Sequence, residues 1–312
     1  MEVIASRRKL YLAFVALAIL AGPVDQSISS SFLAGSPLPT FHSLAIAALL
    51  TAIVLAALAA IRRDRMPNRA EWSALLILIV PQWCYVLIGP NSSPLRALHL
   101  SWGTALLLSL AAPLWLAQLA AANVVRTEVP RSIVAAAIIG IGAVCLSLPV
   151  DAIALTWRQT PAMLLNVLLG IAIVVSWALA RLRLGNCPVA PAAAVYLALS
   201  FLGYAAFAAI YERSFWHAAD WQLSWATLLP EIATLVVSWL LWFWLLAKLS
   251  LGAFSIRMLA NCAATLLPGF AFFGFGRWRM DAAFVISCIA VAIALRATPA
   301  EEQPVSLGLA NP

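Results

Sequence analysis

Charged residues are scarce in this sequence: they make up 10% of its 312 residues, while hydrophobic residues make up 64%. A soluble domain is about a quarter charged, so the composition excludes a soluble protein and leaves little chain for a soluble domain. A membrane-spanning helix needs about 20 mostly apolar residues. The sequence therefore predicts an all-α polytopic membrane protein with about ten transmembrane helices. These are expected near 10–30, 40–61, 72–90, 96–122, 132–150, 160–182, 189–211, 226–247, 250–273 and 280–296.

Motifs of common catalytic, cofactor and metal sites are also missing. The chain has no HExxH, no GxSxG and no phosphate-binding GxxxxGK[ST], which argues against an enzyme, a bound cofactor and ATP as the energy source. Its five cysteines include no CxxC pair, so neither a disulfide framework nor a zinc site is expected.

The basic residues present give a net charge of +7. In a soluble protein this would suggest a nucleic-acid partner, but in a membrane protein lysine and arginine set the orientation. With the N-terminus in the cytoplasm, one group of cations falls inside and a smaller group outside. The inside group is Arg7, Arg8, Lys9, Arg62, Arg63, Arg65, Arg69, Arg126, Arg131, Arg181, Arg183, Lys248 and Arg296, and the outside group is Arg96, Arg158, Arg213, Arg277 and Arg279. We expect a multi-pass protein of the cell inner (plasma) membrane with both termini cytoplasmic, in contact with the lipid bilayer and with no nucleic acid.

The chain has two halves of similar plan. Residues 1–150 and 151–297 each contain five predicted spans, whose starts recur at an offset of about 150 residues. Because five is odd, the second half enters the membrane from the opposite side, which predicts an inverted repeat. The alternative is that any series of similar hairpins looks periodic. The fifth and tenth spans are rich in small residues and are expected in helix packing or a homodimer. Residues 298–312 are expected to form a disordered cytoplasmic tail.

This plan resembles the drug/metabolite transporter superfamily of EamA type. The stretch SPLPTFHSLAIAALLTAIVLAALAAIRR resembles the second span of that family, and WLLWFWLLAKLSLGAF through AAFVISCIAVAIAL resembles its last three spans. The resemblance implies a secondary transporter with a cavity lined by spans one, three, four, six, eight and nine. We expect alternating access that exports a small organic metabolite such as an amino acid. A flippase for a lipid-linked substrate and a non-transporting membrane subunit or enzyme are the alternatives.

Ionisable residues at membrane depth are the first candidates for a site. Arg257 lies about 13 Å along its helix from Lys248, near the midplane, where it could bind a carboxylate or phosphate; the alternative is a snorkelling or structural arginine. Asp25 follows Gly22 and Pro23, so it could line an outer vestibule or sit where the helix ends in water. Glu231 follows Pro230 and is read as an end cap or as a proton site. Either carboxylate could carry a coupling proton.

Aromatic residues supply the remaining candidates. Trp83, Trp102 and Trp242 could line the cavity and stack on an aromatic or cationic solute, although packing or an interfacial belt is the favoured interpretation. His42 is read as a structural interfacial histidine, and Glu212 with Arg213 as a solvated loop pair that contributes little.

Overall fold

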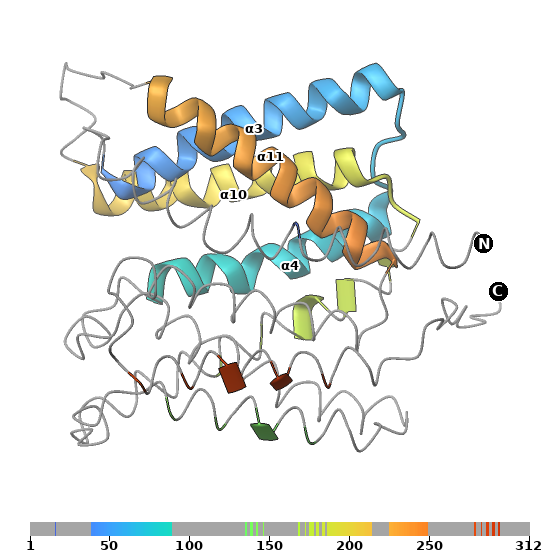
Figure 1. Ribbon diagram of the computed structural model, residues 1–312. Coiled ribbons are helices and arrows are strands. Elements are labelled where there is room, and N and C mark those ends of the chain that lie inside the picture. The colour runs from blue at the N-terminus through green and yellow to red at the C-terminus, as the bar shows by residue number, and fades with distance from the viewer. Residues whose placement is uncertain are drawn as a thin grey trace.

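The computed structural model describes residues 39–88, 183–184, 186–213 and 225–248, together with isolated helical positions elsewhere in the chain. Its four continuous elements are all helices: α3 (Thr40–Arg62), α4 (Arg69–Ile88), α10 (Val189–Tyr211) and α11 (Trp225–Lys248). No strand occurs among these residues. Figure 1 shows the four helices side by side as a bundle. The prediction of an all-α protein is confirmed for the described part of the chain.

Three of the helices could cross a membrane by length and composition: Thr40–Arg62, Val189–Tyr211 and Trp225–Ala247. They coincide with the spans predicted near 40–61, 189–211 and 226–247, and α4 coincides with the one near 72–90. This is consistent with a membrane location. The other predicted spans and the tail at 298–312 lie outside the continuous described residues.

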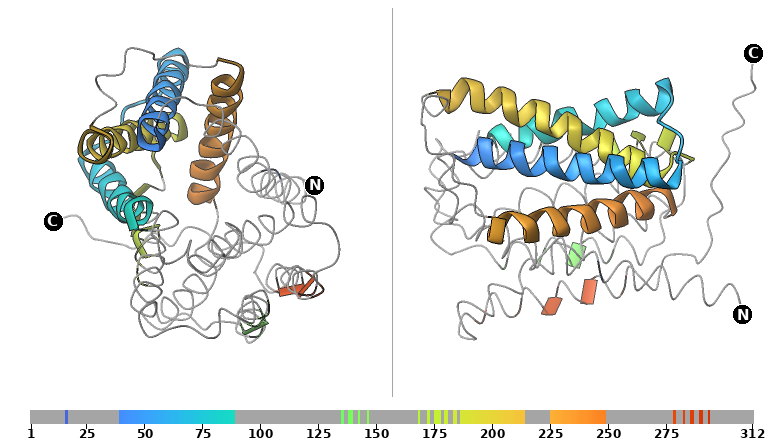
Figure 2. Two further views of the ribbon diagram at one scale, coloured as in Figure 1. Left: turned by 90° about the vertical axis from the view of Figure 1, so that its left-hand side faces the viewer. Right: turned by 90° about the horizontal axis from the view of Figure 1, so that it is seen from above.

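The four helices run in two directions, α3 and α11 one way and α4 and α10 the other. Glu212, just after the end of α10, hydrogen-bonds to Phe41 at the start of α3, so these two helices are antiparallel. Leu228 near the start of α11 packs against Ala47 near the start of α3, so α11 and α3 are parallel. Figures 1 and 2 show the same arrangement, with the six-residue stretch 63–68 between α3 and α4 at the end where α10 begins and α11 finishes.

Among the described helices α3 and α10 form the most extensive contact, and their buried residues are mostly small. The buried alanines of α3 are Ala45, Ala47, Ala48, Ala52 and Ala59, and those of α10 are Ala190, Ala192, Ala193, Ala194 and Ala208. Small side chains allow two helix backbones to approach closely, and this close packing stabilises helix pairs in a membrane, where there is no hydrophobic driving force between helices. α10 also contacts α4 and α11, and α11 contacts α3. The α3–α10 pair is therefore the centre of the described bundle.

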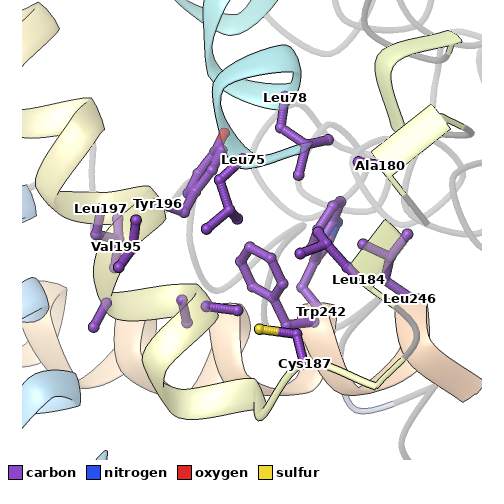
Figure 3. Packing of buried hydrophobic residues seen from close by; sticks show 14 of the residues in the cluster. Leu75, Leu78, Ala180, Leu184, Cys187, Val195, Tyr196, Leu197, Trp242 and Leu246 are labelled. Atoms are coloured by element: carbon purple, nitrogen blue, oxygen red, sulfur yellow. The ribbon is translucent and has the colours of Figure 1, made fainter. Parts of the chain in front are cut away.

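A larger apolar cluster lies toward the end of the bundle where α10 begins. Figure 3 shows Trp242 and Leu246 of α11 beside Leu184 and Cys187, which precede α10. Leu75 and Leu78 of α4 belong to the same cluster and are almost completely buried. The cluster joins residues from both halves of the chain, so neither half forms this core alone.

Candidate functional site

The buried polar face of α11 is the first feature of a candidate site. Glu231, Thr234 and Ser238 recur at the spacing of one helix face, and all three are buried, Glu231 being 2% exposed. They belong to a helix long and apolar enough to span a membrane. Polar and ionisable groups are costly there, and by default they suggest a site that binds or moves a polar species.

Proline interrupts the backbone beside this carboxylate. Pro230 lies inside α11, immediately before Glu231. It has no N–H to donate to the carbonyl of Ala226, one turn earlier. A carbonyl released in this way is tolerated at membrane depth where protein or a hydrated path can satisfy it. The polar face thus begins near the carbonyl of Ala226, which has no hydrogen bond from Pro230.

Glu231 is well inside the helix and is not at its end. From Trp225 to Glu231 the helix rises about 9 Å, and the first turn of α11 contains no acidic residue. The end-cap interpretation of Glu231 is therefore wrong.

Trp242 occupies the same face of α11 as Glu231, about 16 Å further along the helix. It is buried against other aromatic rings: its centroid lies 3.8 Å from that of Trp177 and 5.0 Å from that of Phe243. Trp239 joins this group and packs on Tyr196 of α10 at 4.5 Å. In the described structure these rings pack edge-to-face or tilted against one another, so Trp242 is a packing residue on the face of α11 that carries Glu231.

Trp83 of α4 packs against α10. A Cβ atom added to Gly203 would overlap the indole nitrogen of Trp83, so the indole lies directly on the α10 backbone. The Nε1 atom of Trp83 is buried, and it has no hydrogen-bond partner among the described residues. The Oγ atom of Ser238 is also buried and also has no hydrogen-bond partner among the described residues. Both are buried groups able to hydrogen-bond to a solute, or to a water molecule, that reaches them.

The structure brings together only some of the predicted site residues. Trp83 packs against the core cluster that contains Trp242, whereas Glu231 lies on the same face of α11 as Trp242 but about 16 Å away along the helix. Asp25, Trp102 and Arg257 lie outside the described residues. Thr234 and Ser238 were not predicted as site residues, although their spacing from Glu231 on a predicted helix was a usable signal.

The stretch between α3 and α4 is held by an ion pair. Nη1 and Nη2 of Arg65 donate hydrogen bonds to the two carboxylate oxygens of Glu71 at 2.7 and 2.6 Å, and Nη2 also donates to the carbonyl of Asn186 at 3.0 Å. Glu71 accepts a bond from the N–H of Asn68 and donates its own N–H to the Asn68 side chain, which is a reciprocal helix cap. These contacts join the start of α4 to the residues before α10.

The same contacts change the acidity of two groups at this end of the bundle. Hydrogen bonding from Arg65 lowers the pKa of Glu71, because it stabilises the ionised carboxylate. Burial, with the nearby Glu71 carboxylate adding to it, raises the pKa of Cys187 to about 12. Cys187 is thus held as a neutral thiol, and a reactive or metal-binding role is disfavoured. Within the described ranges, no group of three or more His, Cys, Asp or Glu side chains could hold a metal ion.

A second polar contact joins the opposite ends of α3 and α10. The Glu212 carboxylate accepts hydrogen bonds from the N–H groups of Phe41 and His42, and it lies 2.6 Å from Nδ1 of His42. The interpretation of Glu212 as a solvated partner of Arg213 is wrong, because Glu212 caps α3. The structural interpretation of His42 agrees with its burial in this contact.

Comparison with known proteins adds information on the fold alone. No protein-family model matches the sequence, and no curated protein matches it either. A crystal structure of a protein is similar to this one with a TM-score of 0.65, over 94% of this chain and 98% of that chain. The two sequences are 17% identical. The likeness over almost the full length of both chains shows a shared fold.

Proposed function

We propose that this protein is a secondary transporter that exports a small organic metabolite, such as an amino acid, across the cell inner membrane. The observation that carries the proposal is the buried polar face of α11, with Glu231 beside Pro230 in an apolar helix of membrane-spanning length. A carboxylate in that position can exchange a proton or balance a charged solute. Arg257, at the predicted depth of the midplane, is proposed to bind an anionic group of the substrate.

The packing of α3 with α10 supports an inverted repeat. In the proposed architecture α3 is the second span of one five-helix half, and α10 is the second span of the other. A pseudo-two-fold axis in the membrane plane would make these equivalent helices antiparallel, and antiparallel packing is what the capping contact at Glu212 requires. Alternating access would then involve movement of the two halves about a substrate site, as in drug/metabolite transporters of EamA type.

The distribution of charge supports the proposed orientation. The described lysines and arginines at the end containing the 63–68 stretch are Arg62, Arg63, Arg65, Arg69, Arg183 and Lys248, whereas Arg213 lies at the other end. Positive residues favour the cytoplasmic side, so the 63–68 stretch is proposed to face the cytoplasm. Cysteines introduced at Arg63 and at Arg213 in a cysteine-free variant should react with an impermeant maleimide from inside and from outside the cell, respectively.

The transport proposal is tested by flux in proteoliposomes. We would measure counterflow of a labelled amino-acid panel at controlled pH for the wild type, Glu231→Gln, Arg257→Ala and the control Asp64→Asn. The control removes a carboxylate outside the buried face. Saturable flux that Glu231→Gln abolishes or makes independent of pH, with Asp64→Asn unaffected, would support the proposal. If flux is unchanged in Glu231→Gln, the buried polar face of α11 has no role in transport and the proposal loses its main support. Absence of flux for any solute in the wild type would favour the lipid-linked flippase.

A further inference from the structure

One face of α4 is exposed over about its first three turns. Trp72, Leu76 and Val80 are 39%, 45% and 50% exposed, and Arg69 is exposed one turn before them. The spacing places all four on the same side of the helix. From Arg69 to Val80 the helix rises about 16 Å, which is close to half of the roughly 30 Å hydrocarbon thickness of a bilayer.

The order of these residues matches the chemistry of a phospholipid. Leu76 and Val80 offer apolar surface to an acyl chain, and Trp72 is the type of residue that prefers the level between headgroup and hydrocarbon. Arg69 then stands at the level of the phosphate. Because α4 coincides with the span predicted near 72–90, these three apolar side chains are expected at membrane depth, where a lipid rather than a soluble protein can contact them.

Two further exposed arginines lie at the same end of the bundle as Arg69. Arg62 and Arg63 end α3, and their side chains, like that of Arg69, are exposed. Within the described part of the chain none of the three has a hydrogen-bonding or ion-pair partner, whereas their neighbour Arg65 is occupied by Glu71. All three guanidinium groups are therefore exposed and, among the described residues, unpaired at one end of the bundle, the end proposed to face the cytoplasm.

The backbone between Arg62 and Arg69 is held by hydrogen bonds at both of its ends. Arg63 adopts the left-handed conformation, with φ of 54°, and its N–H bonds to the carbonyl of Ala60 at 3.1 Å. Asp64 donates its N–H to the carbonyl of Ala59 at 3.0 Å. At the other end of the stretch the reciprocal cap between Asn68 and Glu71 fixes the start of α4. An arrangement that is ordered before binding loses less entropy when a ligand binds.

We propose that Arg62, Arg63 and Arg69, with the exposed face of α4, form a binding site for an anionic phospholipid. The arginines bind the headgroup phosphate, Trp72 packs at the glycerol level, and an acyl chain lies along Leu76 and Val80. Because Arg62 ends α3 and Arg69 begins α4, the site includes residues on both sides of the 63–68 stretch. This site is independent of the transport proposal, since it requires only that the bundle spans a membrane.

The test measures lipid-dependent thermal stability of the full chain in detergent. Phosphatidylglycerol or phosphatidylcholine is titrated into wild type, into the triple variant Arg62→Gln, Arg63→Asn, Arg69→Gln, and into Arg213→Gln, which removes an arginine at the opposite end. We expect phosphatidylglycerol to raise the melting temperature of wild type and of Arg213→Gln more than phosphatidylcholine does. The triple variant should lose that preference, with an apparent affinity weakened by about tenfold or more.

Two additional measurements complete the test. The first distinguishes a lipid headgroup from free phosphate as the bound group, and the second distinguishes loss of lipid binding from a folding defect in the triple variant. Inorganic phosphate at matched concentration should leave the melting temperature unchanged; an equal shift would overturn a lipid site in favour of an anion site. The variant with lysine at all three positions should fold and keep the preference for phosphatidylglycerol. Equal responses to the two lipids in wild type, or a preference that persists in the glutamine and asparagine variant, would overturn the proposal.

Discussion

The carboxylate of Glu212 lies 2.6 Å from Nδ1 of His42, although the two residues are 170 positions apart in the sequence. The same carboxylate accepts hydrogen bonds from the backbone N–H groups of Phe41 and His42 at 2.9 and 3.0 Å. The first N–H groups of a helix have no partner within the helix, and a negative charge is favourable at that end. The Glu212 side chain, just after α10, therefore caps the N-terminus of α3 by accepting hydrogen bonds from its first N–H groups.

We predict that Glu212→Ala destabilises the protein by about 2 kcal/mol, because it removes a helix cap and leaves two partly buried donors without partners. Thermal unfolding in detergent should show a lowered melting temperature. Glu212→Gln retains one amide oxygen as an acceptor and should have an intermediate effect. The matched control is Arg213→Ala, an exposed neighbour that should leave the melting temperature unchanged. Equal effects of Glu212→Ala and Arg213→Ala would contradict the capping role.

The role of Glu212 shows where prediction from this sequence stops. Read locally, Glu212 and Arg213 form an exposed pair after a helix, and that interpretation is wrong. The cap cannot be recognised from the residues around position 212, because its donors belong to a helix in the other half of the chain. Only the antiparallel packing of α3 with α10 brings them together.

Acid should weaken the bundle through Glu71. Hydrogen bonds from Arg65 lower the pKa of Glu71 in the folded protein, so the unfolded chain binds more protons in the interval between the lowered value and the usual value of about 4.3. The stabilisation is complete above the usual value and is lost as the pH falls through the lowered one. We predict a falling melting temperature as the pH decreases below about 5.

The substitution Glu71→Gln isolates this contribution. It should lower the melting temperature at neutral pH and reduce the slope below pH 5, because the titrating group and its ion pair are both absent. The variant Asp64→Asn serves as the control, since Asp64 forms no ion pair among the described residues. A slope in Glu71→Gln as steep as that of the wild type would show that other carboxylates cause the acid sensitivity.

The extent of the helices could be predicted well, and the reason is physical. A membrane span depends on an unbroken apolar stretch of sufficient length, which is a local property. The predicted stretches 189–211 and 226–247 therefore agree closely with α10 and α11. Which face of α11 is buried depends on its neighbours. The aromatic candidates illustrate the difference, since Trp242 is fully packed by Trp177 and Phe243, and periodicity alone could not separate packing from a cavity lining.

Cys187 should be slow to react with thiol reagents. Its burial and the adjacent Glu71 raise its pKa to about 12, so almost no thiolate is present at pH 7.5, and the thiolate is the reactive form. A variant that keeps Cys187 as its single cysteine should be labelled by maleimide far more slowly when folded than after denaturation. The rate should continue to rise up to pH 10. A plateau near the ordinary thiol pKa of about 8.5 would contradict the burial of this group.

The contact between Trp83 and Gly203 gives a prediction about packing of α4 against α10. A Cβ at Gly203 would overlap the indole of Trp83, so Gly203→Ala must displace the ring or separate the helices. We predict a loss of about 1–3 kcal/mol, measured as a lowered melting temperature. This holds even though alanine is intrinsically the better helix former by about 1 kcal/mol.

The control for this substitution is another helical glycine with open surroundings. Apart from its chain neighbours and the backbone of its own helix, Gly142 has no atom within 4 Å of the position that a Cβ would occupy, so Gly142→Ala should be neutral or slightly stabilising. In the Gly203→Ala background, Trp83→Leu should recover part of the lost stability, because the shorter side chain removes the overlap, whereas Trp83→Leu alone should be destabilising through the cavity it leaves. Additive losses in the double variant would show that Gly203 and Trp83 do not meet as the structure places them.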